Sequence, residues 1–251
     1  MRILLSNDDG YDAPGMETLR RIAEALTDDI IVVAPAKEQS GASRSLTLHD
    51  PIRLNKFSDR EYSVEGTPTD CVMMALNYLF ADNKPDMILS GVNRGGNLGE
   101  DVLYSGTVAA ASEGTLLGVR SVAISQCILD ADRIHWDTAA EMAPEIIQTL
   151  LKSDWGEDVL MNINFPAVGL EDVLGIKVTT QGKRDLSNLS IDDRVDARGR
   201  DYFWLGYRPS FGEPPEGVDL RAVVDGYVSV TPLKLNLTEQ QLATDLSKAF
   251  V

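Results

Sequence analysis

Short apolar runs alternate with longer amphipathic stretches along the first two thirds of the chain. The first run, residues 2–6, is followed by residues 15–26, in which apolar side chains recur at helical spacing. Three more runs are rich in β-branched residues and are typical of buried parallel strands: 30–34, 87–90 and 121–125. Three further segments have helical composition: 70–80, 106–117 and 138–151. Because strand and helix alternate to about residue 165, the pattern predicts an α/β fold with a doubly wound, mostly parallel sheet.

The pattern changes from about residue 175 to short strands separated by polar loops. Strands are expected at 176–180, 201–207 and 227–233, and we predict that they form hairpins and not βαβ units. Residues 208–217 have the composition of a loop, and 238–250 that of a terminal helix capped by Thr238. We therefore expect one domain with a core of about residues 1–170. A C-terminal β-hairpin arm and end segment, about 171–251, would lie in the interface of a homo-oligomer.

The charge of the chain excludes several kinds of partner. Its 251 residues include 39 Asp and Glu against 23 Lys and Arg, a formal charge of −16. Binding to a nucleic-acid polymer depends on neutralising phosphates with basic residues, so neither such a polymer nor an anionic membrane surface is an expected partner. Small anions stay possible, because oriented amides or a bound cation can reverse the potential locally.

Cysteine and histidine usage points to a cytoplasmic protein without a zinc centre. Cys71 and Cys127 form no CxxC pattern and are expected to be buried in a reducing compartment, and neither a signal peptide nor a membrane span is apparent. His49 and His135 lie far apart and outside any zinc-binding pattern. Any metal should therefore be held by oxygen.

Two adjacent carboxylates directly follow the first predicted strand. Ligands of open α/β sheets bind beyond the carboxyl ends of the strands, which is where Asp8 and Asp9 are expected. Such a pair repels unless a cation or a proton lies between its members, and a divalent metal would supply that charge. An Asx turn capping the next helix is the alternative explanation of this Asn-Asp-Asp-Gly stretch.

The loop after the second predicted strand is rich in small hydroxyl residues. Ser40 or Ser43 could supply a neutral oxygen to a metal, although an ordinary serine-rich loop would have the same composition. Lys37 and Arg44 in this loop, like Arg94 later in the chain, could assist an anion or could be solvated charges.

The loop after residue 90 has the most unusual composition. Four glycines and two asparagines occur among residues 91–99, so the backbone could approach a ligand closely. Asn93 and Asn97 offer acceptors for a metal and donors for a phosphate.

Residues 104–107 precede an alanine-rich helix. The free amides and positive dipole end of such a helix start bind anions. Ser105 and Thr107 could equally serve only as helix caps.

Several familiar catalytic motifs are absent from the sequence. It contains no P-loop, no dinucleotide-binding GxGxxG after the first strand and no GxSxG nucleophile elbow. The two aspartates are adjacent, whereas phosphatases that form an aspartyl-phosphate usually space theirs by one residue. Covalent catalysis by Asp8 is therefore a minor interpretation.

Taken together, these loops make the chain resemble the SurE (survival protein E) family of metal-dependent nucleotidases. The matching stretches occur in the family's order and extend to about residue 235. They are Ser6-Asn7-Asp8-Asp9-Gly10, Ala13-Pro14-Gly15, Ala34-Pro35, Gln39-Ser40-Gly41-Ala42-Ser43, Gly66-Thr67-Pro68-Thr69-Asp70-Cys71, Ser90-Gly91-Val92-Asn93, Gly95, Asn97, Gly99, Tyr104-Ser105-Gly106-Thr107-Val108-Ala109, Asn162-Ile163-Asn164 and 225–232. Residues 130–155 and 208–217 match loosely, and substrate preference could be set there.

The resemblance implies a Rossmann-like core that hydrolyses nucleoside 5′- and 3′-monophosphates to nucleoside and phosphate. It places one divalent cation per subunit, Mg²⁺ or Mn²⁺, on Asp8, Asp9, Ser40 and Asn93. It places the substrate phosphate on Asn97, Ser105, Gly106 and Thr107. It further implies dimers or tetramers that exchange the C-terminal hairpin, and a secondary activity on short polyphosphate.

We expect one of the two aspartates, Asp8 or Asp9, to accept a proton from the attacking water. Two alternatives use the same loops. A non-catalytic sensor would bind a mononucleotide without releasing phosphate, and a glycosyltransferase would need a sugar-nucleotide donor and would release nucleoside diphosphate.

Overall fold

The computed structural model describes residues 1–130, 132–184, 189–207 and 213–250. Its centre is a nine-stranded sheet in the order β3-β4-β2-β1-β5-β6-β7-β11-β8. The six neighbouring strands from β4 to β7 run parallel, while β3 and β11 are antiparallel to the strands that flank them on the inner side. The predicted α/β class with a mostly parallel sheet is confirmed.

The strands have the following bounds: β1 Arg2–Ser6, β2 Asp29–Pro35, β3 Leu54–Lys56, β4 Glu61–Val64, β5 Met87–Arg94, β6 Arg120–Gln126, β7 Val159–Phe165, β8 Ile176–Val178, β9 Leu189–Val195, β10 Asp201–Tyr207 and β11 Val228–Lys234. The helices are α1 Pro14–Glu24, α2 Pro68–Met74, α3 Gly106–Leu116, α4 Trp136–Leu151, α5 Asp219–Val224 and α6 Gln240–Ala249. A π-helix, η1 Ala75–Leu79, continues α2, and two 3₁₀ turns are η2 Gly99–Leu103 and η3 Leu170–Asp172.

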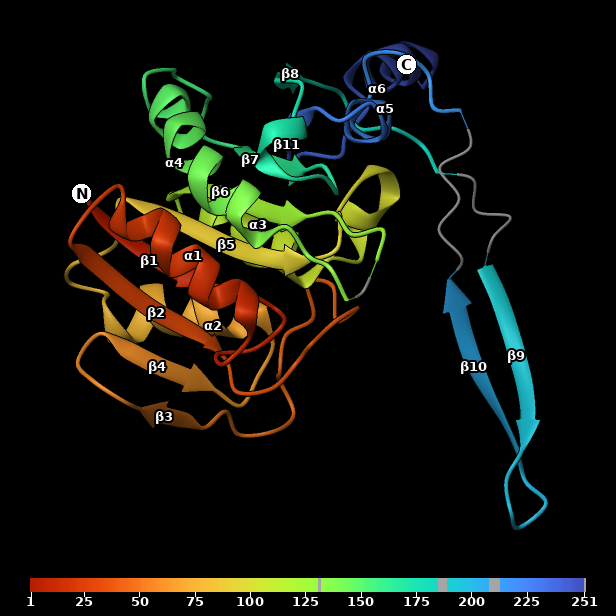
Figure 1. Cartoon of the computed structure of the whole chain (residues 1–251), viewed down its shortest axis with the longest axis horizontal. Helices are drawn as coiled ribbons and strands as arrows, with labels where there is room; N and C mark the ends of the chain where they lie inside the picture. The colour runs from red at the N-terminus through yellow and green to blue at the C-terminus, as the bar shows by residue number, and fades with distance from the viewer. Residues whose placement is uncertain (131, 185–188, 208–212, 251) are drawn as a thin grey trace.

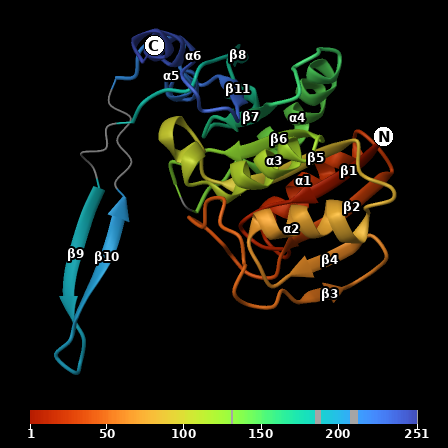
Figure 2. The same ribbon diagram turned by 180° about the vertical axis from the view of Figure 1, so that it is seen from behind.

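Helices cover both faces of the sheet, as a doubly wound fold requires. The apolar sides of α1 and α4 pack on one face with Leu5 and Ile163 of the strands, and Figure 1 shows α1 in front of the sheet. The other face carries α2 and α3 with Leu4 and Ile88, and α2 is in front in the reverse view of Figure 2. Successive strand residues point to opposite faces, so the uninterrupted apolar runs of β1 and β5 are buried on both sides.

The C-terminal third is only partly a hairpin. β9 and β10 pair antiparallel with each other, and Figure 1 shows them standing away from the main sheet. The hairpin prediction is wrong for the other two strands: β11 pairs antiparallel with β7, and β8 pairs in parallel with β11. β11 joins the main sheet because its buried residues, such as Val228 and Val230, extend the apolar face, and the largely exposed β8 pairs with it at the edge.

The ends of several elements differ from their predicted positions. The last helix begins one residue later than a Thr238 cap requires, because the side chain of Glu239 accepts the amides of Gln241 and Leu242 instead. The loop expected at 208–217 lies partly outside the described residues, whereas α5 directly after it was not predicted. Among the described helices, none is long and apolar enough to cross a membrane.

Candidate active site

The predicted site residues gather where the winding of the sheet reverses. The connection after β1 leads to β2, whereas the connection after the neighbouring strand β5 leads to β6, so the two connections leave in opposite directions. In open α/β sheets this switch point opens a crevice at the carboxyl ends of the strands. The loop with Asp8 and Asp9 leaves β1 there, and Asn93 lies at the same end of β5.

Asp8 is a buried carboxylate joined to the start of α3. Asp8 is only 4% exposed, and its carboxylate accepts a hydrogen bond from the hydroxyl of Thr107. Burial raises the pKa of Asp8 to about 6; the Thr107 hydrogen bond opposes this shift and the neighbouring charge of Asp9 adds to it. A positive charge beside the Asp8 carboxylate would stabilise its ionised form.

Gly106 permits this close approach. A Cβ atom at Gly106 would lie 2.6 Å from Cβ of Asp8 and 2.9 Å from one of its carboxylate oxygens. Glycine is thus required by the distance between α3 and the β1 loop.

Asp9 lies beside Asp8 but is half-exposed and lines an open cleft. Burial raises its pKa, and the amide of Arg94, which donates to the Asp9 carboxylate at 3.1 Å, opposes the shift. The cleft has a volume of about 290 Å³, and Ser40, Glu38 and Trp136 also line it. The structure therefore brings Asp9 and Ser40, 31 positions apart in sequence, to one cavity.

Asn7 forms the Asx turn that the sequence left as an alternative. Its side chain accepts the amide of Gly10 at 3.2 Å and donates to the Gly10 carbonyl at 2.8 Å. Gly10 has a φ of 108°, which favours glycine at this turn. Because Asn7 makes the turn, and because the N-cap of α1 is Ala13 without a side-chain cap, Asp8 and Asp9 are not needed for capping.

The serine loop is tied to the aspartate loop by its backbone. The amide of Gln39 donates to the carbonyl of Asp8 at 2.8 Å, and the exposed hydroxyl of Ser40 donates to Glu38 at 2.9 Å. Ser43 turns elsewhere, because its hydroxyl donates to the carbonyl of Leu103 at 2.7 Å. The structure thus separates the two serine candidates and leaves Ser40 at the cleft.

The side chain of Asn93 is bonded within its own loop. Its amide nitrogen donates to the carbonyl of Gly95 at 2.8 Å, so the oxygen is the atom of this side chain that could accept a cation.

The environment of Asn97 is more buried than expected. The residue is 6% exposed, and its amide nitrogen donates to the hydroxyl of Ser125 at 2.9 Å. Its backbone is held from β7, because Asn164 accepts the Asn97 amide at 2.8 Å and Asn162 donates to the Asn97 carbonyl at 2.8 Å. Asn97 therefore fixes the glycine-rich loop, and one amide hydrogen remains for a ligand.

The start of α3 fits both roles proposed for it from the sequence. Ser105 is the N-cap and accepts the amide of Val108 at 3.1 Å, while Thr107 bonds to Asp8. The amides of the first turn are not consumed by the cap alone, so this end of an 11-residue helix keeps donors for an anion.

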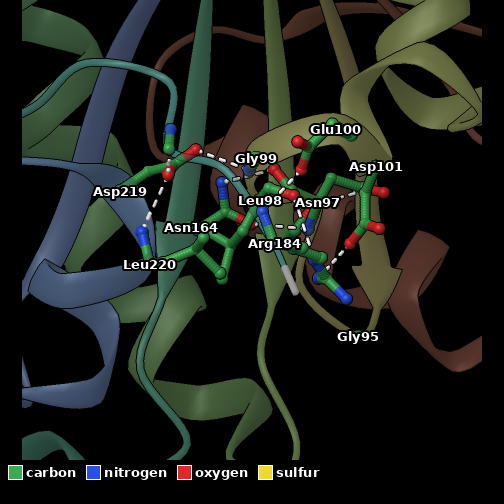
Figure 3. A network of polar contacts seen from close by, with 12 residues as sticks. Gly95, Asn97, Leu98, Gly99, Glu100, Asp101, Asn164, Arg184, Asp219 and Leu220 are labelled. Carbon is green, nitrogen blue, oxygen red and sulfur yellow. Dashed lines mark hydrogen bonds and ion pairs between the residues drawn. The ribbon is translucent and has the colours of Figure 1, made fainter. Parts of the chain in front are cut away.

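The C-terminal segment holds the loop between Asn97 and α3 from outside, as Figure 3 shows. Asp219, which is fully buried, accepts the amides of Gly99, Gly182 and Leu220 at 2.9, 2.8 and 2.8 Å. Arg184 forms an ion pair with Asp101 in the same network. Sequence reasoning missed Asp219, whose only signal was its position at the start of a short helix.

The basic side chains named from the sequence have different surroundings. Lys37 is exposed, and Arg44 approaches Glu113 at 3.9 Å. Arg94 lines the cleft beside Asp9.

Comparison with known proteins places these features in a family. The family model described as "Survival protein SurE" matches residues 3–188. The chain belongs to the SurE family. A protein of Caulobacter vibrioides named "5'-nucleotidase SurE" is 54% identical over 244 residues, covering 96% of this chain and 93% of that protein. One of the same name from Parvibaculum lavamentivorans is 48% identical over 251 residues, covering 99% and 91%.

A solved SurE structure extends the similarity to the whole fold. The crystal structure of the SurE protein from Aquifex aeolicus superimposes with a TM-score of 0.86 at 37% identity and covers 100% of both chains. The Rossmann-like arrangement expected from the resemblance is thus shared with a solved family member.

The donors at the SurE cleft suit a hard cation. No group of three or more His, Cys, Asp or Glu residues gathers among the described residues, so any site here combines the two aspartates with neutral oxygens. Asp8, Asp9, Ser40 and Asn93 supply carboxylate, hydroxyl and amide oxygens, which Mg²⁺ and Mn²⁺ prefer over the nitrogen and sulfur ligands of zinc. Burial is the largest cause of the raised pKa of both aspartates, so a nearby positive charge would stabilise their ionised forms.

Glu38 and Trp136 line the cleft although the sequence analysis did not single them out. Trp136 is the first residue of α4 and lies in the stretch that matched the family loosely. An aromatic residue two positions before the predicted helix 138–151 was the available signal, but core packing gives the same pattern.

Proposed function

We propose that this SurE-family chain is a divalent-metal-dependent phosphatase that hydrolyses nucleoside 5′-monophosphates to nucleoside and inorganic phosphate. The observation that carries the proposal is the hydrogen bond between Thr107 and Asp8, which joins an anion-binding helix start to a pair of buried and half-buried carboxylates. The names of the Caulobacter and Parvibaculum relatives support the same reaction. We extend the proposal to nucleoside 3′-monophosphates and, as a secondary activity, to short polyphosphate.

The proposed metal ligands are Asp8, Asp9, Ser40 and Asn93. When bound, Mg²⁺ or Mn²⁺ would polarise a phosphate oxygen and lower the pKa of a coordinated water. The cation also answers how an anionic substrate approaches a chain of charge −16.

The chain's own residues would orient the phosphate and move one proton. The amides of Gly106 and Thr107, with the remaining amide hydrogen of Asn97, would bind the non-bridging oxygens, where negative charge must be stabilised. The amide of Ser105 already donates to the carbonyl of Asp101 at 2.9 Å, so Ser105 would contribute through its hydroxyl. Asp8 or Asp9 would accept the proton of the water that attacks phosphorus in line. The nucleoside oxygen leaves with a proton, so one water is consumed for each phosphate released.

The test is phosphate release by purified, metal-stripped protein. AMP, GMP, CMP, UMP, 3′-AMP and tripolyphosphate are supplied separately with Mg²⁺, Mn²⁺ or EDTA. We expect metal-dependent release from the nucleotides that EDTA abolishes. Saturable binding of AMP without release would instead indicate a sensor, and release of nucleoside diphosphate from a sugar nucleotide would indicate a glycosyltransferase.

We also propose a homodimer or homotetramer built through the arm. Phe203, Trp204 and Leu205 on β10 are 62%, 61% and 80% exposed, and a two-stranded ribbon has little stability of its own in water. Removing residues 189–207 should lower the mass measured by light scattering to that of a smaller assembly, and an unchanged mass would refute the role of the arm.

We also propose that the protein is cytoplasmic. Cys71 and Cys127 are both free and buried, as expected of a protein kept in a reducing compartment. Fractionation of the producing cells would test it.

A further inference from the structure

The lining of the cleft beside Asp9 combines two kinds of chemistry. Asp9, Glu38, Ser40 and Arg94 supply charged and polar groups. Pro14, Gly15 and Trp136 supply carbon surface. A ligand of this cleft should therefore have one polar end and one flat, apolar end.

The Trp136 indole lies beside the start of α1. The tip of the indole, Cη2, is 3.5 Å from the point that a Cβ on Gly15 would occupy, which is an ordinary van der Waals distance. A Cβ on Gly15 would come within 1.9 Å of the carbonyl oxygen of Val92, which restricts position 15 to glycine. The indole thus lies close to a segment of α1 that is itself packed tightly on β5.

The indole is half-exposed although it packs against the main core. It lines the catalytic cleft and also an adjoining groove of about 640 Å³, which includes Arg21 and His135. Trp136 therefore lines both the cleft and the groove. A large aromatic surface kept accessible beside a catalytic site is suited to stacking on a planar ligand.

We infer that Trp136 is the specificity-determining residue that stacks on the base of the nucleotide substrate. The inference rests on the proposed phosphatase function and names how the same site distinguishes a nucleotide from a simple sugar phosphate. The phosphate end of the substrate lies toward Asp9 and α3, and the base lies against the indole. Stacking reads the presence and size of the base more than its hydrogen-bonding edge, so purines are preferred modestly over pyrimidines.

The test compares substrates with and without a base. Parent, Trp136→Ala, Trp136→Leu and Trp136→Phe proteins are assayed for phosphate release from AMP, CMP and ribose 5-phosphate. Loss of one base-aromatic stack lowers kcat/KM for AMP by about 10- to 100-fold in the alanine variant. The leucine variant, which keeps apolar bulk without an aromatic face, shows most of that loss, and the phenylalanine variant stays within about threefold of the parent. Hydrolysis of ribose 5-phosphate is unchanged in all of them.

Trp155→Phe is the matched control. Trp155 is 8% exposed, packs in the same apolar cluster and precedes β7, so its replacement changes the core without changing the cleft. It should leave the ratio of AMP to ribose 5-phosphate hydrolysis at the parent value. An equal loss on AMP and ribose 5-phosphate in the Trp136 variants would assign that residue to structure, and an unchanged kcat/KM for AMP would also overturn the inference.

A binding measurement separates this inference from the reaction itself. Tryptophan fluorescence is titrated with AMP and with ribose 5-phosphate in the presence of Mn²⁺ or of EDTA. AMP should quench the parent and Trp155→Phe proteins but not Trp136→Phe, even if no phosphate is released. Quenching by AMP without phosphate release would reject the phosphatase function and retain the stacking role of Trp136. Phosphate release without base-dependent quenching would retain the phosphatase function and reject the stacking role. The absence of both quenching and release would reject both proposals.

Discussion

Gly106→Ala should inactivate the enzyme while leaving its fold intact. The new Cβ would lie 2.6 Å from Cβ of Asp8, whereas ordinary contacts begin at 3.4 Å, so one of the two groups must move by 0.8 Å, the difference between these distances. A misplacement of about 1 Å can cost about 100-fold in rate, and we expect this loss in kcat/KM for AMP.

The stability of Gly106→Ala should change little. Alanine in a helix is favoured over glycine by about 1 kcal/mol, and overpacking costs about 1–3 kcal/mol, so the net loss is at most about 2 kcal/mol. At about 2–4 °C per kcal/mol for a chain of this size, the melting temperature falls by no more than about 8 °C. Phosphate release is measured at 25 °C, well below that transition, and the melt is followed by circular dichroism.

Gly114→Ala in the same helix is the matched control. A Cβ at Gly114 would lie 2.3 Å from Cδ1 of Ile88 and 2.5 Å from the hydroxyl of Ser121, both inside the fold. The control should lower the melting temperature similarly and keep kcat/KM within about twofold, since it does not displace the carboxylate. A Gly106→Ala enzyme with parental kcat/KM, or equal losses in both variants, would refute the reasoning that the position of Asp8 governs activity.

Three other substitutions test separate parts of the structure. Asp8→Asn keeps an acceptor for Thr107 but removes the charge, so phosphate release should fall about 10²- to 10⁴-fold with unchanged circular dichroism; substantial activity in a variant that still binds metal would contradict the assignment. Asp219→Ala leaves three amides without their acceptor and should cost about 3 kcal/mol or more in urea unfolding, whereas the control Asp225→Ala, which removes one half-buried ion pair with Arg221, should cost about 1 kcal/mol or less. Burial raises the pKa of Glu61, but hydrogen bonds from Arg20 and Tyr11 outweigh it and leave that pKa below its ordinary value. This contribution is present above the unfolded pKa near 4.5 and disappears as pH falls through the lowered folded value, so Arg20→Met should lose about 1 kcal/mol of stability at pH 7 and progressively less as pH falls below 4.5. An equal loss at all pH values would assign the effect to packing.

The parallel core could be predicted from sequence because burial on both faces leaves a clear trace. Strands such as β1 and β2 are continuous apolar runs, and the helices between them show a 3.6-residue period. By contrast, β3 spans three residues with two exposed, too few for a period to be visible. β8 is similarly short, and its place beside β11 depends on pairing between segments separated by the arm.

The sequence indicated which residue types lie at the ends of the strands, but not which of these residues contact one another. The positions of Asp8, Asp9, Ser40 and Asn93 near strand ends follow from the rule for open sheets. Which hydroxyl reaches Asp8, and which serine stays at the cleft, depend on long-range geometry that no local pattern contains. The buried bond from Asn97 to Ser125 shows the same limit, since the sequence indicates an amide in a glycine-rich loop but not the direction in which it points.

The two ends of the arm meet at its base. The amide of Thr180 donates to the carbonyl of Gly217 at 3.0 Å, and the amide of Asp219 donates back to Thr180 at 2.9 Å. The chain therefore enters and leaves the projecting segment at adjacent points, between β8 and α5. Because the two ends of the arm are adjacent, an insertion or deletion within the arm can change its length without moving any strand of the main sheet. If the arm carries the proposed assembly, that assembly can evolve separately from catalysis in one continuous chain, and the arm is the place at which to insert a different two-stranded ribbon.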